Sequence, residues 1–236
     1  MINNKKNIAF IFARGGSKGL PRKNIKLFNG EPLIKWTIDQ AFQSNICEQV
    51  IVSTDDEEIA KVSEDSGAKV PFLRPKNLAS DESREWLAWQ HCVNELYENQ
   101  DYNFISLPCV CPLRTPDDIR NAVSYYENRT SDLVFTIAKS DRSPYVNMVE
   151  QDKDGFVNLS KSVDTTKIYR RQDSPIVFNI VPSVYVTSPK YILSNNSMWD
   201  GKISGFEVPH ERGIDIDSEI DFNIAEFLHK NIHGKK

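Results

Sequence analysis

The sequence predicts an α/β fold with a mostly parallel sheet that is covered by helices on both faces. Residues 8–12 form a continuous apolar run, which is typical of a strand buried on both faces of a parallel sheet. Strand-like and helix-like segments then alternate as far as about residue 139, and this alternation favours parallel strands joined by crossover helices. A chain of 236 residues is also long enough to bury the core that such a sheet needs.

The first two helices are predicted from the residues that open them. Pro32 suits the first turn of a helix because its backbone angle is already helical, and Leu33 and Trp36 then recur at helical spacing. Residues 50–52 indicate a second buried strand. The acidic residues 55–58 follow it and favour a helix start, because carboxylates stabilise the positive end of the helix dipole.

The remaining elements are assigned from the same apolar periodicity. They are helices at residues 84–97, 115–126 and 219–230, and strands at residues 104–107, 133–137 and 181–186. The last helix is predicted to be amphipathic, since its apolar residues recur at helical spacing. These residues are Ile220, Ile224, Phe227 and Leu228.

The alternation breaks at residues 140–180, where short stretches of alternating polarity surround a turn glycine, Gly155. We interpret this segment as an excursion of hairpins or long loops that protrudes from a single domain spanning residues 1–236. Its apolar residues lack the periodicity of the main sheet, and left bare they would form a sizeable apolar patch. They are Tyr145, Val146, Met148, Val149, Phe156, Val157, Ile168 and Tyr169. A second copy around a two-fold axis would cover them, so we expect a homodimer.

Composition and charge exclude several classes of protein. With 39% hydrophobic and 26% charged residues, the chain is neither collagen-like nor a low-complexity disordered segment. A net charge of -4 provides no strong basic field for nucleic acid or an anionic membrane. The first apolar run is far shorter than the ~20 residues that cross a bilayer, and it lacks a secretory cleavage site. We expect a cytoplasmic protein that binds neither nucleic acid nor a membrane.

Four cysteines, Cys47, Cys92, Cys109 and Cys111, are expected to be free thiols, because the chain carries no export signal. Cys109 and Cys111 form a C-x-C pair, but no second Cys or His pair stands nearby at zinc-site spacing. Packing of these thiols beside a strand end is therefore favoured over a structural zinc site.

The loop at residues 13–24 is the most informative segment of the chain. Its glycines allow the backbone to approach a ligand closely, and its cations would repel one another unless they were solvated or neutralised. These residues are Gly15, Gly16 and Gly19, and Arg14, Lys18, Arg22 and Lys23. The loop follows the first strand, where open α/β sheets bind ligands, and a triphosphate is the obvious counter-charge. It matches neither the dinucleotide fingerprint nor the Walker loop, and a solvated basic turn is the alternative.

Six short motifs follow one another along the chain. They are A-R-G-G-S-K-G-x-P-x-K-N at residues 13–24, V-S-T-D at 52–55, F-L-R-P at 72–75, L-A-S-D at 78–81, P-L-R-T at 112–115 and I-D-I-D at 214–217. In this order they resemble the CMP-sialic acid synthetases, also called acylneuraminate cytidylyltransferases. One such motif would be weak evidence, but six in sequence carry the resemblance over nearly the whole chain.

The resemblance implies a Rossmann-like nucleotidyltransferase fold with a protruding dimerisation excursion. The implied enzyme transfers CMP from CTP to a 2-keto-3-deoxy sugar acid and releases pyrophosphate. Its implied nucleotide-binding residues are Arg14, Gly15, Gly16, Ser17, Lys18, Lys23, Asn24, Arg74 and Asp81. As a catalytic residue, Lys23 would contact the α-phosphate. Arg14, also a catalytic residue, and Lys18 would contact the departing β- and γ-phosphates. Such cations neutralise the transferring group without any covalent intermediate.

The acidic pair Asp215 and Asp217 matches the position that holds Mg²⁺ in this family. In an extended segment the two carboxylates share one face and Ile216 faces the other way, and Mg²⁺ prefers such hard oxygen ligands. Asp217 is also the implied acceptor of the proton of the attacking hydroxyl. From the residues alone, the pair equally suits the start of the last helix with Ser218 and Glu219.

Three segments depart from the usual pattern of the family, at Pro108, at residues 82–85 and at residues 180–183. Each of them corresponds to contacts with the base or the acceptor. The triphosphate loop and the acidic pair are intact. CTP chemistry is therefore better supported by the sequence than the identity of the sugar.

Residues 143–148 and 170–172 resemble branches that act on sialic-acid-like nonulosonic acids such as legionaminic acid. The resemblance implies that Arg170, Arg171 and Gln172 bind the sugar, and the two arginines could hold its carboxylate through paired hydrogen bonds. Solvated charges on a protruding loop are the alternative. In the implied dimer the excursion reaches the partner's active site, so these arginines would serve a sugar bound mainly by the other subunit.

A CMP-nonulosonate synthetase is the expected function. A second possibility keeps the chemistry but uses another acid acceptor, such as a Kdo-like sugar or a phosphonate. A third is a non-catalytic nucleotide-binding protein of the same fold. The intact Lys23, Asp215 and Asp217 argue against the third, because binding alone requires no metal pair beside the reacting phosphate.

Overall fold

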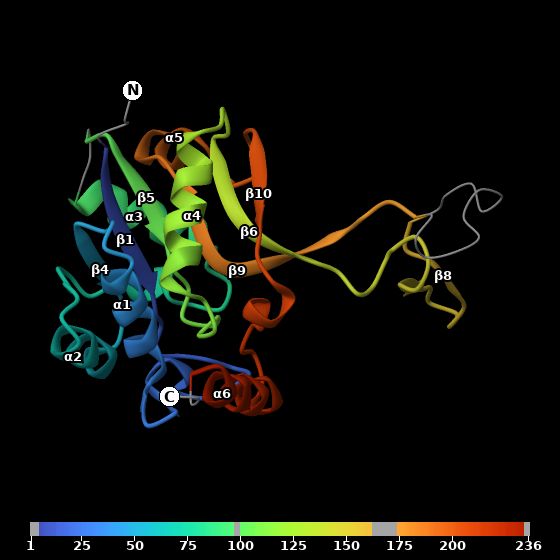
Figure 1. Cartoon of the computed structure of the whole chain (residues 1–236), viewed down its shortest axis with the longest axis horizontal. Coiled ribbons are helices and arrows are strands. Elements are labelled where there is room, and N and C mark those ends of the chain that lie inside the picture. The colour runs from blue at the N-terminus through green and yellow to red at the C-terminus, as the bar shows by residue number, and fades with distance from the viewer. Residues whose placement is uncertain (1–4, 97–99, 162–173, 234–236) are drawn as a thin grey trace.

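The computed structural model describes residues 5–96, 100–161 and 174–233 (Figure 1). Within them, six strands form one sheet in the order β10-β6-β9-β5-β1-β4. They are β1 (Lys6–Phe12), β4 (Gln49–Ser53), β5 (Tyr102–Ser106), β6 (Leu133–Lys139), β9 (Phe178–Thr187) and β10 (Ile203–Glu207). β1 runs parallel to β4 and β5, and β10 runs parallel to β6, whereas β9 is antiparallel to both of its neighbours. The predicted α/β fold is confirmed, with one reversed strand inside a mostly parallel sheet.

Helices cover both faces of this sheet. One face carries α1 (Leu33–Gln43), α2 (Glu57–Asp65) and α4 (Pro116–Glu127), and the other carries α3 (Glu85–Leu96) and α5 (Pro189–Ser194). In β1, Ala9 and Ile11 enter the first core, while Ile8 and Phe10 enter the second. Because both faces of β1 are buried, the strand needs a continuous apolar run. Among the helices of the described ranges, none combines the length and apolar character that crossing a bilayer requires.

Hydrogen bonds at the helix starts fix two residues near the carboxyl edge of the sheet. Asp56 caps α2, and its carboxylate accepts the backbone N–H groups of Glu58 and Ile59, both at 3.0 Å. Thr115 caps α4 and forms a reciprocal capping box with Asp118. The loops before α2 and α4 are therefore rigidly attached to their helices.

The closing helix, α6 (Glu219–His233), packs through a different face from the predicted one. Its buried side chains are Phe222, Ala225 and His229 and Leu228 is half-buried, whereas Ile220, Ile224 and Phe227 are exposed. The partner surface comprises Leu20 of the loop after β1, Phe28 of the short strand β2 (Leu27–Phe28), which pairs with β3 (Glu31–Pro32), Leu33 of α1, and Ile216 of the segment before α6. A helix with apolar residues on two sides has no unique buried face by periodicity, and the available partner surface decides.

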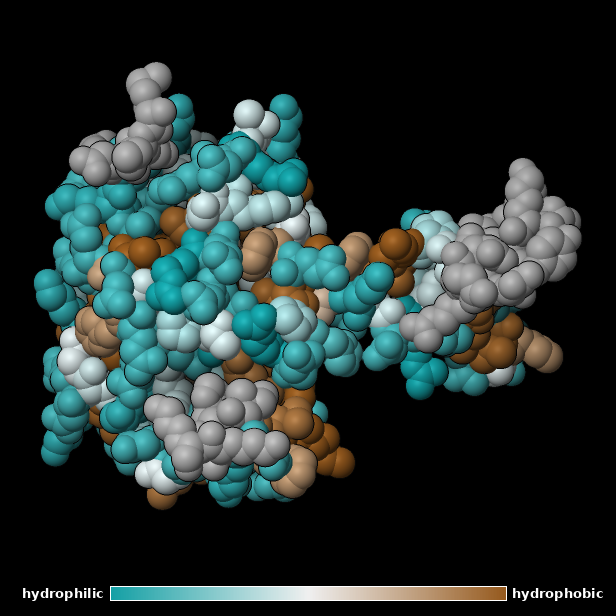
Figure 2. Space-filling view, in the orientation of Figure 1, coloured by the Kyte–Doolittle hydropathy of each residue, from teal (hydrophilic) through white to brown (hydrophobic). Residues whose placement is uncertain are grey.

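Residues 140–161 and 174–177 leave the sheet as the predicted excursion, which projects far from the body (Figure 1). β6 and β9 run together into its base, where Lys139 pairs with Phe178. Its far part holds the hairpin of β7 (Val149–Gln151) and β8 (Val157–Leu159), with Gly155 in the turn at a φ of 88°. Exposed apolar side chains gather on the excursion (Figure 2); they are Val146, Met148, Val149, Phe156, Val157 and Leu159 in its far part and Ile176 nearer its base.

Candidate active site

A pocket at the carboxyl edge of the parallel strands brings most of the predicted site residues together. Its volume is about 530 Å³, and its walls include the loop after β1, residues 78–81 and the segment before α6. The predicted residues that line it are Arg14, Ser17, Lys18, Lys23, Asn24, Arg74, Asp81, Asp215 and Asp217. Gly15 and Gly16 belong to the same loop but are not among the lining residues. Both the position and the size of the pocket suit a nucleotide.

Lys23 joins the basic loop to the acidic pair. Its side chain is almost buried, and Nζ donates to the carbonyl oxygen of Ile216 and to Oδ1 of Asp217, the latter at 3.3 Å. Gly19 contacts the same segment so closely that a Cβ would lie 2.2 Å from the carbonyl oxygen of Asp217. Only glycine fits there. The loop and the acidic segment therefore form one rigid wall of the pocket.

The acidic pair has the geometry that was predicted for an extended segment. Ile216 is fully buried in the cluster beneath α6, while Asp215 and Asp217 on either side of it line the pocket. Oδ1 of Asp215 is buried and has no hydrogen-bond partner. Burial, together with the charge of Asp217, raises the pKa of Asp215 to about 6.

The start of α6 uses other residues, which separates the two interpretations of the acidic pair. Oγ of Ser218 accepts the backbone N–H of Asp221 at 3.3 Å, and Oδ2 of Asp221 accepts the N–H of Ser218 at 2.8 Å. This reciprocal pair caps the helix. The carboxylates of Asp215 and Asp217 therefore remain available to a ligand.

The two carboxylates fit Mg²⁺ by their chemistry and by the orphaned oxygen of Asp215. In the described ranges, no group of three or more His, Cys, Asp or Glu side chains is arranged to hold a metal ion. Mg²⁺ keeps several waters and uses substrate phosphates as ligands, so a pair of carboxylates is a sufficient protein contribution.

Asp81 lies against two cations of the loop. Its carboxylate is 2.7 Å from Nη1 of Arg14 and 2.9 Å from Nζ of Lys18. The hydrogen bond from Lys18, followed by that from Arg14, lowers the pKa of Asp81 below its usual range. A carboxylate therefore occupies the point on which the two cations converge.

Arg74 also lines the pocket, and its side chain is buried. Its Nη2 atom is 4.0 Å from Oδ1 of Asp55, and its buried Nε atom has no hydrogen-bond partner. Burial lowers the pKa of the guanidinium. The backbone N–H of Arg74 donates to the carbonyl oxygen of Thr54 at 2.7 Å, which fixes this arginine beside the end of β4.

The positions that depart from the family pattern also border the pocket. Pro108, Pro182 and Glu85 all line it, and the carboxylate of Glu85 accepts a hydrogen bond from Nε1 of Trp89 at 3.1 Å. The departures thus concern the walls that surround a bound ligand. The predicted sugar-binding residues Arg170, Arg171 and Gln172 lie outside the described residues.

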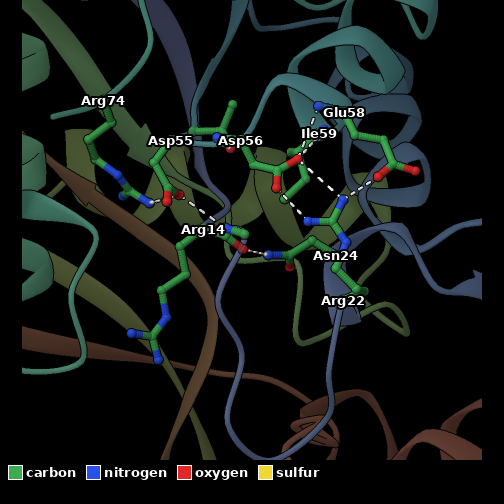
Figure 3. A network of polar contacts seen from close by, with 10 residues as sticks. Arg14, Arg22, Asn24, Asp55, Asp56, Glu58, Ile59 and Arg74 are labelled. Atoms are coloured by element: carbon green, nitrogen blue, oxygen red, sulfur yellow. Dashed lines mark hydrogen bonds and ion pairs between the residues drawn. The ribbon is translucent and has the colours of Figure 1, made fainter. Parts of the chain in front are cut away.

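Sequence reasoning missed the carboxylates that hold the loop. The backbone N–H of Gly15 donates to Oδ1 of Asp55 at 3.0 Å, and the guanidinium of Arg22 pairs with Asp56 and Glu58 (Figure 3). The acidic run at residues 55–58 indicates a helix start, but its negative charge is also complementary to the positive charge of the loop. This complementarity could have been used to predict the contact from the sequence. Arg22 is therefore neutralised within the protein.

Asn24 has a structural contact of its own. Its Nδ2 atom donates to the carbonyl oxygen of Arg14 at 3.0 Å and so ties the two ends of the loop together (Figure 3). The resemblance implies a position near the cytidine for Asn24. Its side chain lines the pocket as well, so the hydrogen bond and a nucleotide contact are compatible.

The four cysteines are free thiols. Cys109 borders the pocket, but burial raises its pKa to about 12, and the same cause raises the pKa of Cys92 to about 12. A thiol with such a pKa carries almost no thiolate near neutral pH. The buried thiols of Cys92 and Cys109 are therefore poorly suited to act as nucleophiles.

A basic, glycine-containing loop and an acidic pair, facing one pocket at the carboxyl edge of an α/β sheet, define a nucleotidyltransferase. The family model described as "Cytidylyltransferase" matches residues 8–190. The chain belongs to this cytidylyltransferase family.

Proteins with established names are similar over nearly the whole chain. The CMP-N,N'-diacetyllegionaminic acid synthase of Campylobacter jejuni is 35% identical over 221 residues, covering 92% of this chain and 92% of its own. The pseudaminic acid cytidylyltransferase of Campylobacter jejuni is 33% identical over 238 residues, covering 97% of this chain and 98% of its own. Both similarities cover more of the chain than the family-model match does.

A solved structure supports the fold. The structure of CMP:2-keto-3-deoxy-manno-octonic acid synthetase complexed with CTP aligns with a TM-score of 0.73, at 16% sequence identity, over 96% of this chain and 99% of its own. The predicted Rossmann-like nucleotidyltransferase fold is thereby confirmed.

Proposed function

We propose that this cytidylyltransferase transfers CMP from CTP to a 2-keto-3-deoxy nonulosonic acid, a sialic-acid-like sugar, and releases pyrophosphate. The observation that carries the proposal is the contact of Lys23 with Asp217, which joins a phosphate-binding loop to a pair of carboxylates suited to Mg²⁺. Two relatives that match over nearly the whole chain act, by their names, on legionaminic and pseudaminic acids. Both acids belong to the same chemical class of acceptor.

The cations of the loop would neutralise different phosphate groups of CTP during the reaction. Lys23, held at the acidic wall, would neutralise the α-phosphate as the sugar hydroxyl attacks it. Arg14 and Lys18 would exchange Asp81 for the β- and γ-phosphates and stabilise the departing pyrophosphate. Preorganised charges of this kind lower the barrier because they need no rearrangement during the reaction.

Asp215 and Asp217 would hold Mg²⁺ through their carboxylate oxygens. When bound there, the ion would supply charge neutralisation at the phosphates and would acidify the attacking hydroxyl. Asp217 is the more exposed of the pair, so its carboxylate is placed to accept the proton of that hydroxyl. Asp215, with its buried oxygen, would serve as a ligand only.

The acceptor is tested by pyrophosphate release from CTP with N,N'-diacetyllegionaminic acid, pseudaminic acid, N-acetylneuraminic acid and Kdo. We expect the highest kcat/KM with one of the first two acids. Equal or faster turnover with Kdo would support the alternative acceptor class. A complete lack of turnover with all four acids, in a preparation that binds CTP, would support a nucleotide-binding role instead.

We also propose that the protein is a homodimer formed through the excursion. The apolar side chains of the hairpin support this, since Phe156 is 71% exposed and Val157 is 57% exposed. Light scattering should give about twice the mass of one chain. Phe156→Glu combined with Val157→Glu should give a folded monomer, because neither side chain packs in the core. An unchanged dimer in this variant would move the interface elsewhere.

The dimer proposal includes a shared active site. If Arg170 or Arg171 serves the partner's sugar, a mixture of Arg171→Ala chains and Lys23→Ala chains should regain activity, because the heterodimer keeps one unaltered composite site. A lack of rescue in a mixture that does exchange subunits would assign those arginines to their own subunit's site.

A further inference from the structure

We propose that Arg22 is a positioning residue: its side chain clamps the end of the basic loop to the first turn of α2 and so fixes where Lys23 stands. This inference rests on the proposed function, because it assigns Lys23 to the reacting phosphate. Arg22 occupies one of the two positions that the loop motif leaves unspecified.

The backbone of Arg22 makes a turn that few residues with a side chain adopt. Its φ is 56° and its ψ is 26°, in the left-handed region. The next residue, Lys23, opens the short 3-10 helix η1 (Lys23–Ile25), and its N–H donates to the carbonyl oxygen of Leu20 at 3.2 Å. The conformation of Arg22 thus determines the start of η1 and the position of Lys23. An unfavourable conformation persists only where other contacts hold it.

The contacts that hold it are ion pairs with α2 (Figure 3). Nη1 of Arg22 donates to Oδ2 of Asp56, and Nη2 lies 3.3 Å from Oδ1 of the same carboxylate. Nη2 also donates to Glu58. Two carboxylates therefore engage one guanidinium, in the fork geometry that arginine provides and lysine does not.

Asp56 is a fixed anchor for this clamp. Its carboxylate caps α2 by accepting two backbone N–H groups, and its own N–H donates to Oγ1 of Thr54 at 3.2 Å. The hydrogen bond from Arg22 lowers the pKa of Asp56, so this carboxylate stays ionised near neutral pH. A side chain bound to Asp56 is thus bound to the end of β4 and to α2 at once.

The same acidic turn also holds the beginning of the loop. The N–H of Gly15 donates to Oδ1 of Asp55, and a Cβ at Gly15 would lie 2.6 Å from Oδ2 of Asp56. Adjacent carboxylates therefore fix both ends of the segment that carries Ser17 and Lys18. Both of those residues line the pocket.

Arg22 differs from the other cations of the loop in where its charge is directed. Arg14, Lys18 and Lys23 line the pocket, whereas Arg22 is absent from its lining and is engaged by two carboxylates. A guanidinium already neutralised in this way has little charge to offer a triphosphate. The chemistry of Arg22 is therefore directed at the protein and not at the nucleotide.

The test compares Arg22→Ala, Asp56→Asn and the double variant in steady-state kinetics with CTP. Asparagine still caps α2, so Asp56→Asn removes the charge of the anchor and keeps the helix start. We expect each single variant to lower kcat by up to about 100-fold, as misplaced catalytic groups do, with the KM for CTP changed much less. The double variant should be no slower than Arg22→Ala, because both changes break the same clamp. Arg22→Lys should restore only part of the loss.

Arg120→Ala is the matched control: like Arg22, Arg120 pairs with a carboxylate, that of Asp117, and also bonds a neighbouring element, at the carbonyl oxygen of Ser44, but it is absent from the pocket lining. It should keep the wild-type kcat. If Arg22→Ala raised the KM for CTP and left kcat unchanged, Arg22 would be a nucleotide ligand and the proposal would be wrong. Multiplying effects in the double variant would equally overturn it.

Amide hydrogen exchange of the CTP-free protein provides a readout that is independent of the reaction. Arg22→Ala should speed exchange in residues 13–24 and leave α4 unchanged, while Arg120→Ala should not alter the loop. Unchanged exchange in the loop would refute the clamp even in an active enzyme. If the wild-type enzyme accepted no sugar acid at all, the proposed function would fail, but the exchange experiment would still decide whether the clamp exists.

Discussion

The Nζ atom of Lys23 lies 3.3 Å from Oδ1 of Asp217, a contact between residues 194 positions apart in the sequence. The lysine side chain is 10% exposed and the aspartate side chain 79%. Because the carbonyl oxygen of Ile216 also holds Lys23, the ammonium group can exchange the exposed carboxylate for a phosphate oxygen without leaving its place. This contact connects the basic loop to the acidic pair.

Lys23→Ala is expected to lower kcat by about 100- to 1,000-fold, the usual effect of losing one preorganised charge contact in an active site. The fold should persist, since the lysine is at the pocket wall. Steady-state kinetics and circular dichroism check both points. Lys26→Ala is the control: Lys26 pairs with Glu219 outside the pocket, and its variant should turn over like the wild type. A Lys23→Ala enzyme of normal kcat would remove Lys23 from the chemistry.

Asp217→Asn is expected to weaken the Mg²⁺ dependence of the reaction more than the binding of CTP, because the loop supplies part of the affinity for the nucleotide. The Mg²⁺ concentration for half-maximal rate should rise by at least about tenfold, as expected when one of two charged ligands becomes neutral. Titration of the rate with Mg²⁺, and calorimetry with CTP, separate the two effects. Glu219→Gln, which changes a nearby carboxylate outside the pocket, should titrate like the wild type. An unchanged Mg²⁺ titration of Asp217→Asn would contradict the metal assignment.

Asp81→Asn is expected to bind CTP a few-fold more tightly than the wild type. In the structure, the carboxylate of Asp81 pairs with Arg14 and Lys18, and in the proposed function a triphosphate displaces it from both. These pairs are largely exposed, so the effect should be small and should shrink at high salt. Isothermal titration calorimetry at two ionic strengths provides the measurement. Weaker binding of CTP by this variant would instead make Asp81 a residue that orients the two cations.

Asp56 should make the stability of the protein depend on pH in the acid range. The hydrogen bond from Arg22 keeps the pKa of Asp56 below its value in the unfolded chain. A carboxyl of this kind stabilises the fold above its unfolded pKa of about 3.9, and the contribution is lost as the pH falls through the folded value. Asp56→Asn should therefore lower Tm near neutral pH, and the gap to the wild type should narrow below about pH 4. A gap that stays constant with pH would exclude the charge of Asp56 as its cause.

Local signals predicted most of the fold and most of the candidate site. The buried run in β1, the acidic start of α2 and the order of the motifs all appear in continuous stretches of sequence. Asp215 and Asp217 share a pocket with Lys23, as the family resemblance of their motifs implied.

Contacts between distant residues account for what the sequence pattern did not predict. The buried face of α6 is decided by Phe28 and Leu33, which are far from it in the chain. β10 was not predicted because Gly205 interrupts its apolar pattern; a Cβ at that position would lie 2.5 Å from Cδ1 of Ile137 and would force this side chain to move. The role of Arg22 depends on Asp56, 34 positions away, so no local periodicity reveals it.

The central claim is tested most directly by ³¹P NMR of a reaction containing the protein, CTP, Mg²⁺ and N,N'-diacetyllegionaminic or pseudaminic acid. We predict equal amounts of pyrophosphate and a CMP-sugar phosphodiester, with neither formed when the sugar acid is left out or when Lys23→Ala replaces the wild type over the same time. Hydrolysis of CTP to free CMP with no phosphodiester, or no reaction with either acid, would contradict the claim.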